Sequence, residues 1–313
     1  MGRINRQIWS KEDLLVEFKE RKYLSIMGKG KLSRIYNVSP ELIKEVKKEI
    51  RSKIPKDLPK ILVLDIETAP LESYAWSQWK QNLYDDQIIS NWFMLTWSAK
   101  WLFGDKVHSG RLTPKEALAE DDFRIVGDLR ELLEQADVVI AHNGKRFDIP
   151  KINTRMVMHQ YKPVKPYQQI DTLLIARKEF GFSSNKLDTL GKMFGVGEKI
   201  HTTMALWIGC KRGDDRSLRD MEKYNKQDVL LLEEVYLRMR PFIHSHPNVA
   251  LFMDADKSVC PTCGSDKLTP AGNYYTATSR FEAYQCECGA ISRSRINNYD
   301  KDKRKHLIVS IAR

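Results

Sequence analysis

Two carboxylates close a short apolar segment, Ile61-Leu-Val-Leu-Asp-Ile-Glu-Thr-Ala-Pro70. Four consecutive apolar residues predict a buried strand, and side chains two positions apart in a strand point to the same face. We therefore expect Asp65 and Glu67 to converge at the end of that strand. Because burying carboxylates without a partner is costly, a divalent cation is the expected partner. A solvated junction between strand and loop is the alternative for an isolated pair of acids.

Further acids of the same kind follow in two places. Asp148 comes after an apolar segment and a polar turn, at the expected start of a helix. Tyr224 and Asp228 are four residues apart, and side chains at this spacing on a helix face the same way. Taken singly, Asp148 can be a helix N-cap and the other two can be surface residues. The ordered set D-x-E, F-D and Y-x-x-x-D instead indicates one shared site.

These ordered motifs give the sequence a resemblance to a known family over about residues 60–243. It resembles the DEDD, or DnaQ-like, superfamily of 3′→5′ exonucleases, which have a ribonuclease-H-like fold. Asn143 and Phe147 complete the second motif, N-x-x-x-F-D, before Asp148. The third motif indicates the tyrosine branch, since the other branch has a histidine where this chain has Lys223. Compact bacterial and phage-type members and the proofreading domains of family B polymerases look most similar.

The resemblance implies hydrolysis of phosphodiester bonds with two Mg²⁺ or Mn²⁺ ions. Two divalent ions about 3.5–4 Å apart stabilise the attacking and leaving oxygens. These hard ions prefer carboxylate and water ligands. The resemblance implies that Asp65 bridges both ions, Glu67 and Asp228 complete one coordination shell, Asp148 supports the other, and Tyr224 orients the attacking water. Without metal the four acids would repel one another.

Four of the five cysteines form two close pairs, Cys260-Pro-Thr-Cys263 and Cys286-Glu-Cys288, with 22 residues between the pairs. Four thiolates at this spacing predict a zinc ribbon with one structural Zn²⁺. Disulfides are the alternative, which a cytoplasmic chain disfavours. The second pair is C-x-C, whereas a ribbon knuckle usually has C-x-x-C. The segment resembles nucleic-acid-binding ribbons of phage and transcription proteins, and a purely structural or protein-binding ribbon stays open.

The basic residues gather at the two ends of the sequence. Residues 1–60 hold 16 basic and 8 acidic side chains, a net charge of +8, and residues 257–313 hold 10 and 5, a net charge of +5. The 26 basic and 28 acidic side chains between them give −2. Basic flanks around a slightly acidic centre favour a protein whose ends bind a polyanion. Ordinary solvated surface charge is the alternative.

The N-terminal flank has the pattern of three short helices. Ser10-Lys-Glu-Asp13 is a capping box that predicts a helix from Lys11, and Ser39-Pro40 predicts the start of another. With a short helix over Lys31 to Tyr36 between them, this pattern indicates a helix-turn-helix. On its last helix one basic face is expected, and in the ribbon Arg293 and Arg295 alternate along an expected strand. The predicted nucleic-acid contacts are Lys44, Lys47, Lys48, Arg51, Asn143, Arg293 and Arg295; a solvated helix face is the alternative for the four in the last helix.

Strand and helix patterns alternate through the middle of the chain. We predict an α/β fold in which a ribonuclease-H-like mixed sheet is flanked by helices. Strands are expected at 61–66, in an aromatic-rich region around 91–109, and at 137–141; helices are expected at 114–135, 149–160, 171–180 and within 184–243. The expected domains are a helix-turn-helix-like domain at 1–56, an exonuclease domain at 57–250 and the zinc ribbon at 251–313.

The sequence thus favours a metal-dependent 3′→5′ exonuclease that acts on DNA. Neither a long apolar run nor a signal-peptide pattern is present, so we expect a cytoplasmic protein of a bacterial or phage-infected cell. Replication or repair proteins are its candidate protein partners. Two alternatives stay open: an RNA-processing member of the same superfamily, since the acids do not sense the 2′-hydroxyl, and a non-catalytic DNA-binding regulator. Core packing is expected for most of Trp76, Trp79, Trp92, Trp97 and Trp101, although such rings can stack on unpaired bases.

Overall fold

The computed structural model describes residues 9–20, 32–33, 36–52, 58–77, 79 and 82–311. The chain divides into two compact units. Lys60–Tyr236 form one unit, and Met1–Pro59 with Leu237–Arg313 form the other. Among the described residues, no helix combines the length and the apolar character that crossing a membrane requires.

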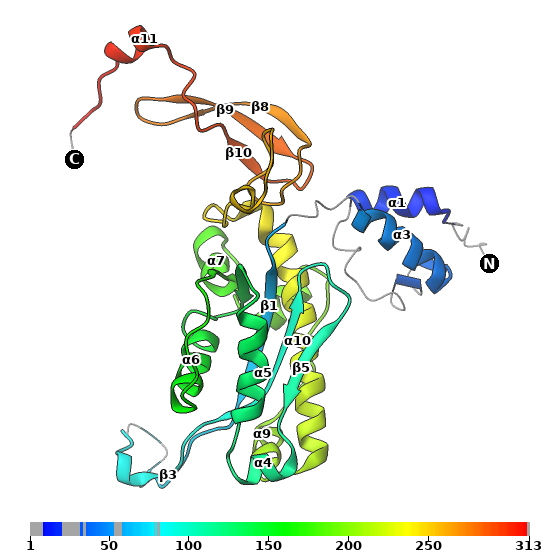
Figure 1. Cartoon of the computed structure of the whole chain (residues 1–313), viewed down its shortest axis with the longest axis vertical. Coiled ribbons are helices and arrows are strands. Elements are labelled where there is room, and N and C mark those ends of the chain that lie inside the picture. The colour runs from blue at the N-terminus through cyan, green and yellow to red at the C-terminus, as the bar shows by residue number, and fades with distance from the viewer. Residues whose placement is uncertain are drawn as a thin grey trace. The chain divides into compact units, whose positions relative to one another are not determined.

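The unit Lys60–Tyr236 is built on a five-stranded mixed sheet (Figure 1). The strand order is β5-β4-β1-β6-β7. β4 runs antiparallel to both β1 and β5, whereas β1, β6 and β7 are parallel to one another. The strands are β1 (Ile61–Thr68), β4 (Met94–Trp101), β5 (Val107–Arg111), β6 (Val138–Ala141) and β7 (Gln168–Asp171).

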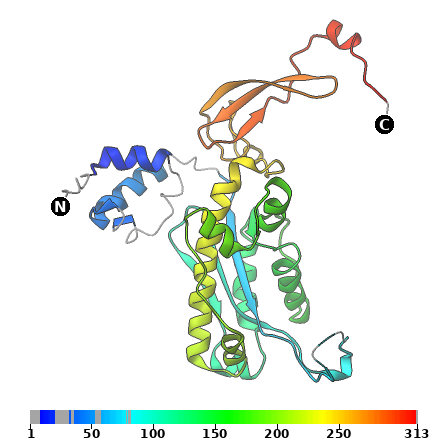
Figure 2. The ribbon, with the colours of Figure 1, turned by 180° about the vertical axis from the view of Figure 1, so that it is seen from behind.

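Helices cover both faces of this sheet, and residue alternation along β4 shows which side chains meet them. Trp97 points toward α5 (Phe123–Leu133), where its Nε1 donates to the Ile125 carbonyl at 2.7 Å. Lys100, whose side chain points to the other face of the sheet, forms a buried ion pair with Glu233 of α10 (Asp215–Met239). α5 and α10 therefore lie on opposite faces, as the two views show (Figures 1 and 2). The remaining helices of this unit are α4 (Pro114–Leu118), α6 (Asp148–Met158), α7 (Thr172–Glu179), α8 (Leu187–Met193) and α9 (Met204–Lys211).

The expected α/β pattern is present, with two differences in its elements. The single helix expected at 114–135 is two helices, because the chain turns at Glu120, where φ is +53°, and buries Asp122. Asp122 accepts hydrogen bonds from the backbone N–H of Met94 at 2.7 Å and from Arg155. A continuous helix would carry Asp122 away from this buried network. Strand β7 was not expected, since its sequence Gln-Gln-Ile-Asp lacks an apolar run.

The N-terminal segment contains two described helices, α1 (Lys11–Glu20) and α3 (Pro40–Ser52). The predicted capping box closes the start of α1, with the backbone N–H of Asp13 donating to Ser10 Oγ at 3.1 Å. Ser39 Oγ caps α3 by accepting from the backbone N–H of Leu42 at 3.1 Å. The side chains of Leu14, Phe18, Leu32, Tyr36, Ile43 and Val46 form a small buried cluster.

The basic face expected on α3 is narrower than predicted. Lys44 and Lys48 are exposed, but Lys47 is only 8% exposed. Positions 43, 46 and 47 lie on one side of a helix, so the face that buries Ile43 and Val46 also takes in Lys47. The side chain of Arg51 and residues 31, 34 and 35 of the expected middle helix lie outside the described residues.

The C-terminal segment contains a three-stranded antiparallel sheet in the order β10-β9-β8. Its strands are β8 (Leu268–Tyr275), β9 (Arg280–Cys286) and β10 (Ile291–Arg293), and a short helix, α11 (Lys301–Lys305), follows. β10 ends at Arg293, so Arg295 lies beyond the strand and the predicted alternation of the two arginines within it is wrong. The Arg293 guanidinium lies 4.0 Å from the centre of the Phe281 ring, a cation–π contact that holds it against β9.

Candidate functional site

Three of the predicted acids converge between β1 and α10. Asp65, Glu67 and Asp228 each offer a carboxylate oxygen within 4.8 Å of the others. Asp65 pairs with Ser98 of β4 and Glu67 pairs with Thr96, so strand alternation places both acids on the same face as Lys100, toward α10. α10 in turn carries Asp228, which is fully buried. The geometry thus brings together the D-x-E pair and the final aspartate.

Asp148 lies beside this group rather than within it. Its side chain is 1% exposed, and its Oδ1 accepts a hydrogen bond from the backbone N–H of Ile66 at 3.1 Å. Ile66 stands between Asp65 and Glu67, so this bond fixes the end of β1 where the other acids project. The alternative that Asp148 is only a helix N-cap is wrong, since Asp148 is the first residue of α6 and Phe147 is its N-cap.

Burial and mutual repulsion disfavour the charged forms of these acids. Burial, assisted by Glu67 and Asp228, raises the pKa of Asp65 well above its usual range. Burial and the charge of Asp228 raise the pKa of Glu67 to about 7. The pKa of Asp148 is also raised by burial and by Asp65. Strongly shifted carboxylates gathered at one point are typical of functional sites.

The donor set fits a hard divalent cation. Asp228 Oδ1 is buried and has no hydrogen-bond partner, and a buried acceptor of this kind requires a proton donor or a cation. The oxygens of Asp65 and Glu67 lie within reach of the same point. Carboxylate oxygens without thiolate or imidazole neighbours are typical ligands of Mg²⁺ and Mn²⁺.

Three further side chains position the acids, and the sequence analysis missed all of them. Asn225 Nδ2 donates to Asp65 Oδ2 at 2.6 Å, and Trp207 Nε1 of α9 donates to Glu67 Oε2 at 3.2 Å. Lys199 Nζ lies 2.5 Å from Asp228 Oδ2 and 3.1 Å from the Tyr224 hydroxyl. A signal was available only for Asn225, which lies within the Y-x-x-x-D motif itself.

Tyr224 lies against the same carboxylate, as its spacing from Asp228 predicted. Its side chain is 7% exposed, and its hydroxyl accepts a hydrogen bond from Lys199 Nζ, which also contacts Asp228. Burial and the charge of Asp228 raise the pKa of this phenol, so the hydroxyl keeps its proton at neutral pH. A protonated phenol held beside the acids can both donate and accept a hydrogen bond.

The turn that precedes Asp148 is organised by Asp171, at the end of β7. Its carboxylate accepts four backbone N–H groups at 3.0–3.2 Å, from Asn143, Lys145, Leu173 and Leu174. Asn143 has φ of +73°, a left-handed conformation that asparagine tolerates. Asp171 therefore caps α7 and also fixes the second motif. His142 is held by Thr172 at 2.9 Å, and burial lowers its pKa to about 4.

A groove of about 490 Å³ adjoins the acids at Trp207. Its other lining residues are Thr68, Ala69, Pro70, Leu71, Trp92, Lys151, Thr202, Thr203 and Met204. Lys151 Nζ lies 3.6 Å from the centre of the Trp92 ring, so a cation and an aromatic face meet at the groove. The mixed apolar and basic lining suits a base or sugar attached to a phosphate.

The five tryptophans noted in the sequence occupy different environments. Trp97 is buried and Trp101 is half-buried against the same core, as expected, whereas Trp92 lines the groove. Trp76 and Trp79 are 94% and 80% exposed. They belong to an arm between β2 (Glu72–Ser73) and β3 (Ile88–Ser90), so core packing is wrong for these two.

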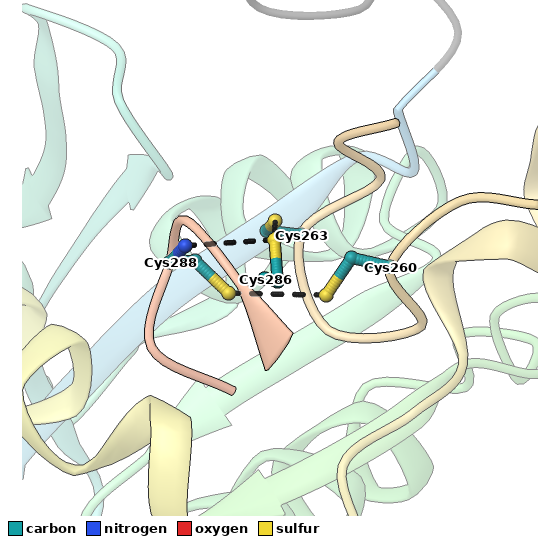
Figure 3. A group of neighbouring side chains, drawn as sticks. All are labelled: Cys260, Cys263, Cys286 and Cys288. Atoms are coloured by element: carbon teal, nitrogen blue, oxygen red, sulfur yellow. Dashed lines mark hydrogen bonds between the residues drawn. The ribbon is translucent and has the colours of Figure 1, made fainter. Parts of the chain in front are cut away.

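The four clustered cysteines also converge, in a separate site in the C-terminal segment (Figure 3). Cys260 Sγ lies 3.8 Å from Cys288 Sγ, and Cys263 Sγ lies 3.5 Å from Cys286 Sγ. Tetrahedral zinc with Zn–S bonds of about 2.3 Å would place its sulfurs about 3.8 Å apart, whereas a disulfide requires about 2.05 Å. All five cysteines are free thiols, so the disulfide alternative is wrong and the sulfur spacing fits zinc.

Two glycine-closed turns bring these sulfurs together. The backbone N–H of Gly264 donates to the Cys260 carbonyl, and that of Gly289 donates to the Cys286 carbonyl, both at 2.8 Å. Both glycines have positive φ, +76° and +88°. The short C-x-C pair still forms a turn, in which the Cys288 N–H approaches Cys286 Sγ at 3.5 Å.

Comparison with known proteins supports the fold. Residues 101–240 match the model of a family described as the RNase_H superfamily. The matched segment includes Asp148, Tyr224 and Asp228 but begins after Asp65 and Glu67. Together with the five-stranded mixed sheet flanked by helices, this match indicates an RNase H-like fold.

The chain resembles solved structures but matches no curated protein. One matched structure is the family B DNA polymerase from the hyperthermophilic archaeon Pyrobaculum calidifontis, with a TM-score of 0.46 and 14% sequence identity. The match covers 72% of this chain and 32% of the polymerase chain.

Proposed function

We propose that the chain is a metal-dependent 3′→5′ exonuclease that removes nucleotides from the 3′ end of DNA. The observation that carries this proposal is the convergence of Asp65, Glu67 and Asp228 on one point, with Asp228 Oδ1 left without a partner. The D-x-E, F-D and Y-x-x-x-D motifs support the direction of digestion by their resemblance to the DEDD exonucleases. The basic flanks support a polyanionic substrate.

The acids would hold two Mg²⁺ or Mn²⁺ ions, with Asp65, Glu67 and Asp228 as ligands and Asp148 in support. When bound, such ions lower the pKa of water and stabilise charge on the attacking and leaving oxygens. Tyr224 orients the attacking water through its hydroxyl. Asn225 and Trp207 hold the carboxylates of Asp65 and Glu67 in fixed directions through the bonds described above.

The groove beside Trp207 would receive the nucleotide at the end of the strand. Its aromatic and apolar residues offer a surface to the base, and Lys151 offers a charge to a phosphate. Its volume of about 490 Å³ would accommodate the terminal nucleotide of the strand.

The flanking segments would supply binding rather than chemistry. We assign residues 1–56 to nucleic-acid binding through Lys44, Lys48 and Arg51. Residues 251–313 would form a zinc ribbon in which Cys260, Cys263, Cys286 and Cys288 bind one structural Zn²⁺. Arg293, whose guanidinium lies against Phe281, is the ribbon residue that we assign to phosphate contact.

Activity on 5′-labelled oligonucleotides tests the proposal. Full-length protein with Mn²⁺ should shorten single-stranded DNA stepwise from its 3′ end. Asp228→Asn should lower the rate by roughly 100-fold or more, because even changes to residues that support metal ligands cost about 10- to 100-fold. Asp220→Asn, on an exposed part of the same helix, is the matched control and should leave the rate unchanged.

Assays on DNA and on RNA distinguish the proposed function from an RNA-processing enzyme and from a non-catalytic regulator. Degradation of RNA in preference to DNA would assign the chain to RNA processing. Retention of full activity by Asp228→Asn would remove the metal site from the mechanism. Binding of DNA with no cleavage under any metal would identify a non-catalytic regulator.

A further inference from the structure

Lys199 places a cation of the protein directly on the acid group. It lies in the segment between α8 and α9, and its ammonium contacts Asp228 Oδ2 at 2.5 Å and the Tyr224 hydroxyl at 3.1 Å. The Lys199 side chain is 29% exposed, whereas Asp228 is fully buried. The ammonium therefore reaches inward from a solvent-accessible segment to a buried carboxylate.

The backbone around Lys199 is anchored so that the side chain points this way. The Lys199 N–H donates to Asp188 Oδ1 at 2.8 Å, and the same aspartate pairs with Lys192 through its other oxygen. Gly195 and Gly197 have φ of +66° and +146°, so the chain turns sharply just before Lys199. The backbone of this loop therefore directs the Lys199 side chain inward.

The charges explain why a cation is stable there. Asp65, Glu67 and Asp228 lie within 4.8 Å of one another, and like charges at such distances repel strongly at low dielectric. Burial opposes the charge of Lys199, but the Asp228 and Asp65 carboxylates raise its pKa, so the ammonium stays protonated. One positive charge lowers the repulsion among three acids without cancelling it.

The two oxygens of Asp228 are used differently. Oδ2 is occupied by Lys199, while Oδ1 has no partner. A divalent ion shared with Asp65 and Glu67 can take Oδ1 directly, but it would then lie close to an ammonium of the same sign. Metal binding therefore disfavours the contact between the Lys199 ammonium and Asp228.

We propose that Lys199 is a displaceable counterion, a positioning residue that holds Asp228 and Tyr224 before metal binds and must withdraw when metal loads. This inference rests on the proposed metal site. It implies that Lys199 sets the metal concentration at which the site fills. It also implies that the acid group keeps its arrangement while no metal is bound.

Manganese binding to full-length protein tests this role. Free Mn²⁺ is measured by electron paramagnetic resonance during titration of the wild type, Lys199→Met and Lys199→Arg. Lys199→Met should bind Mn²⁺ roughly 10-fold more tightly or better, because a charge-assisted bond no longer has to be broken. Lys199→Arg retains the charge and should restore the weaker wild-type affinity. Lys192→Met, which removes the neighbouring lysine bonded to Asp188, is the matched control and should bind as the wild type does.

A second readout separates displacement from simple damage to the fold. Without added Mn²⁺, Lys199→Met should melt at a lower temperature than the wild type, and saturating Mn²⁺ should raise its melting temperature by more than it raises that of the wild type. Unchanged or weaker Mn²⁺ affinity in Lys199→Met overturns the counterion role. If Asp228→Asn binds Mn²⁺ as tightly as the wild type does, the proposed metal site itself is wrong. That outcome is distinct from a failure of the counterion role of Lys199.

Discussion

Manganese affinity should fall at least tenfold for each pH unit below pH 7, because Glu67 must lose a proton before it can bind metal, and Asp65, whose pKa is also raised, adds to this dependence. Burial and Asp228 raise the pKa of Glu67 to about 7 from its ordinary 4.5. At pH 5.5 roughly one molecule in thirty has the Glu67 carboxylate ionised, so affinity should be lower than its value well above pH 7 by at least roughly 30-fold. The measurement is Mn²⁺ titration of full-length protein between pH 5.5 and 8.

The same shift predicts the pH dependence of stability without metal. A carboxyl whose folded pKa is raised stabilises the fold fully below its unfolded pKa, and this contribution is lost as pH rises through the folded pKa. Between pH 4.5 and 7, Glu67 should therefore cost about 3 kcal/mol of unfolding free energy, at about 1.4 kcal/mol per pKa unit. Glu67→Gln removes the titration, so the difference between wild type and variant in urea denaturation isolates it. Equal Mn²⁺ affinity at pH 5.5 and 7.5, or a wild-type minus variant difference that does not change with pH, would refute the reasoning.

Two other predictions concern residues that support the sites. Asp171→Ala should lower the free energy of unfolding by about 2–4 kcal/mol, measured with urea, because a helix cap and the bonds to the Asn143 turn are lost together. Asp214→Ala, which removes an exposed cap on Ser217, should lower it by less. Protein purified without chelator should contain one Zn²⁺ per chain by elemental analysis, and Cys288→Ser should lose it; unchanged zinc content would exclude the C-x-C pair from the site.

Local periodicity was sufficient to predict the residues that share one element. Strand alternation places Asp65 and Glu67 on one face, and helical spacing places Tyr224 beside Asp228; the structure shows both arrangements. The convergence within each cysteine pair was predictable for a similar reason, since two cysteines at such short spacing lie in one turn. For the two acids, for Tyr224 and Asp228, and within each cysteine pair, the geometry is set within a few residues.

Contacts between distant elements could not be predicted in this way. Lys199 reaches Asp228 across 29 residues of sequence, and Trp207 reaches Glu67 across 140. Neither residue lies in a pattern that indicates its partner, because the loop and helix that carry them are placed by packing. Lys47 shows the opposite error, since a periodic basic stripe was interpreted without allowing for the width of the buried face.

The position of α10 on the sheet links packing to chemistry. Glu233 forms a buried pair with Lys100 and accepts the Phe103 N–H at 2.9 Å, while Glu222 accepts from Ser109 at 2.7 Å. These two glutamates lie on either side of the Tyr224–Asp228 segment. Apolar packing alone would allow a helix to shift along the sheet, but a shift of one turn here would break the polar contacts of both glutamates and bury a charge without its partner. The same shift would move Asp228 by about 5.4 Å, beyond the span over which the three acids now meet.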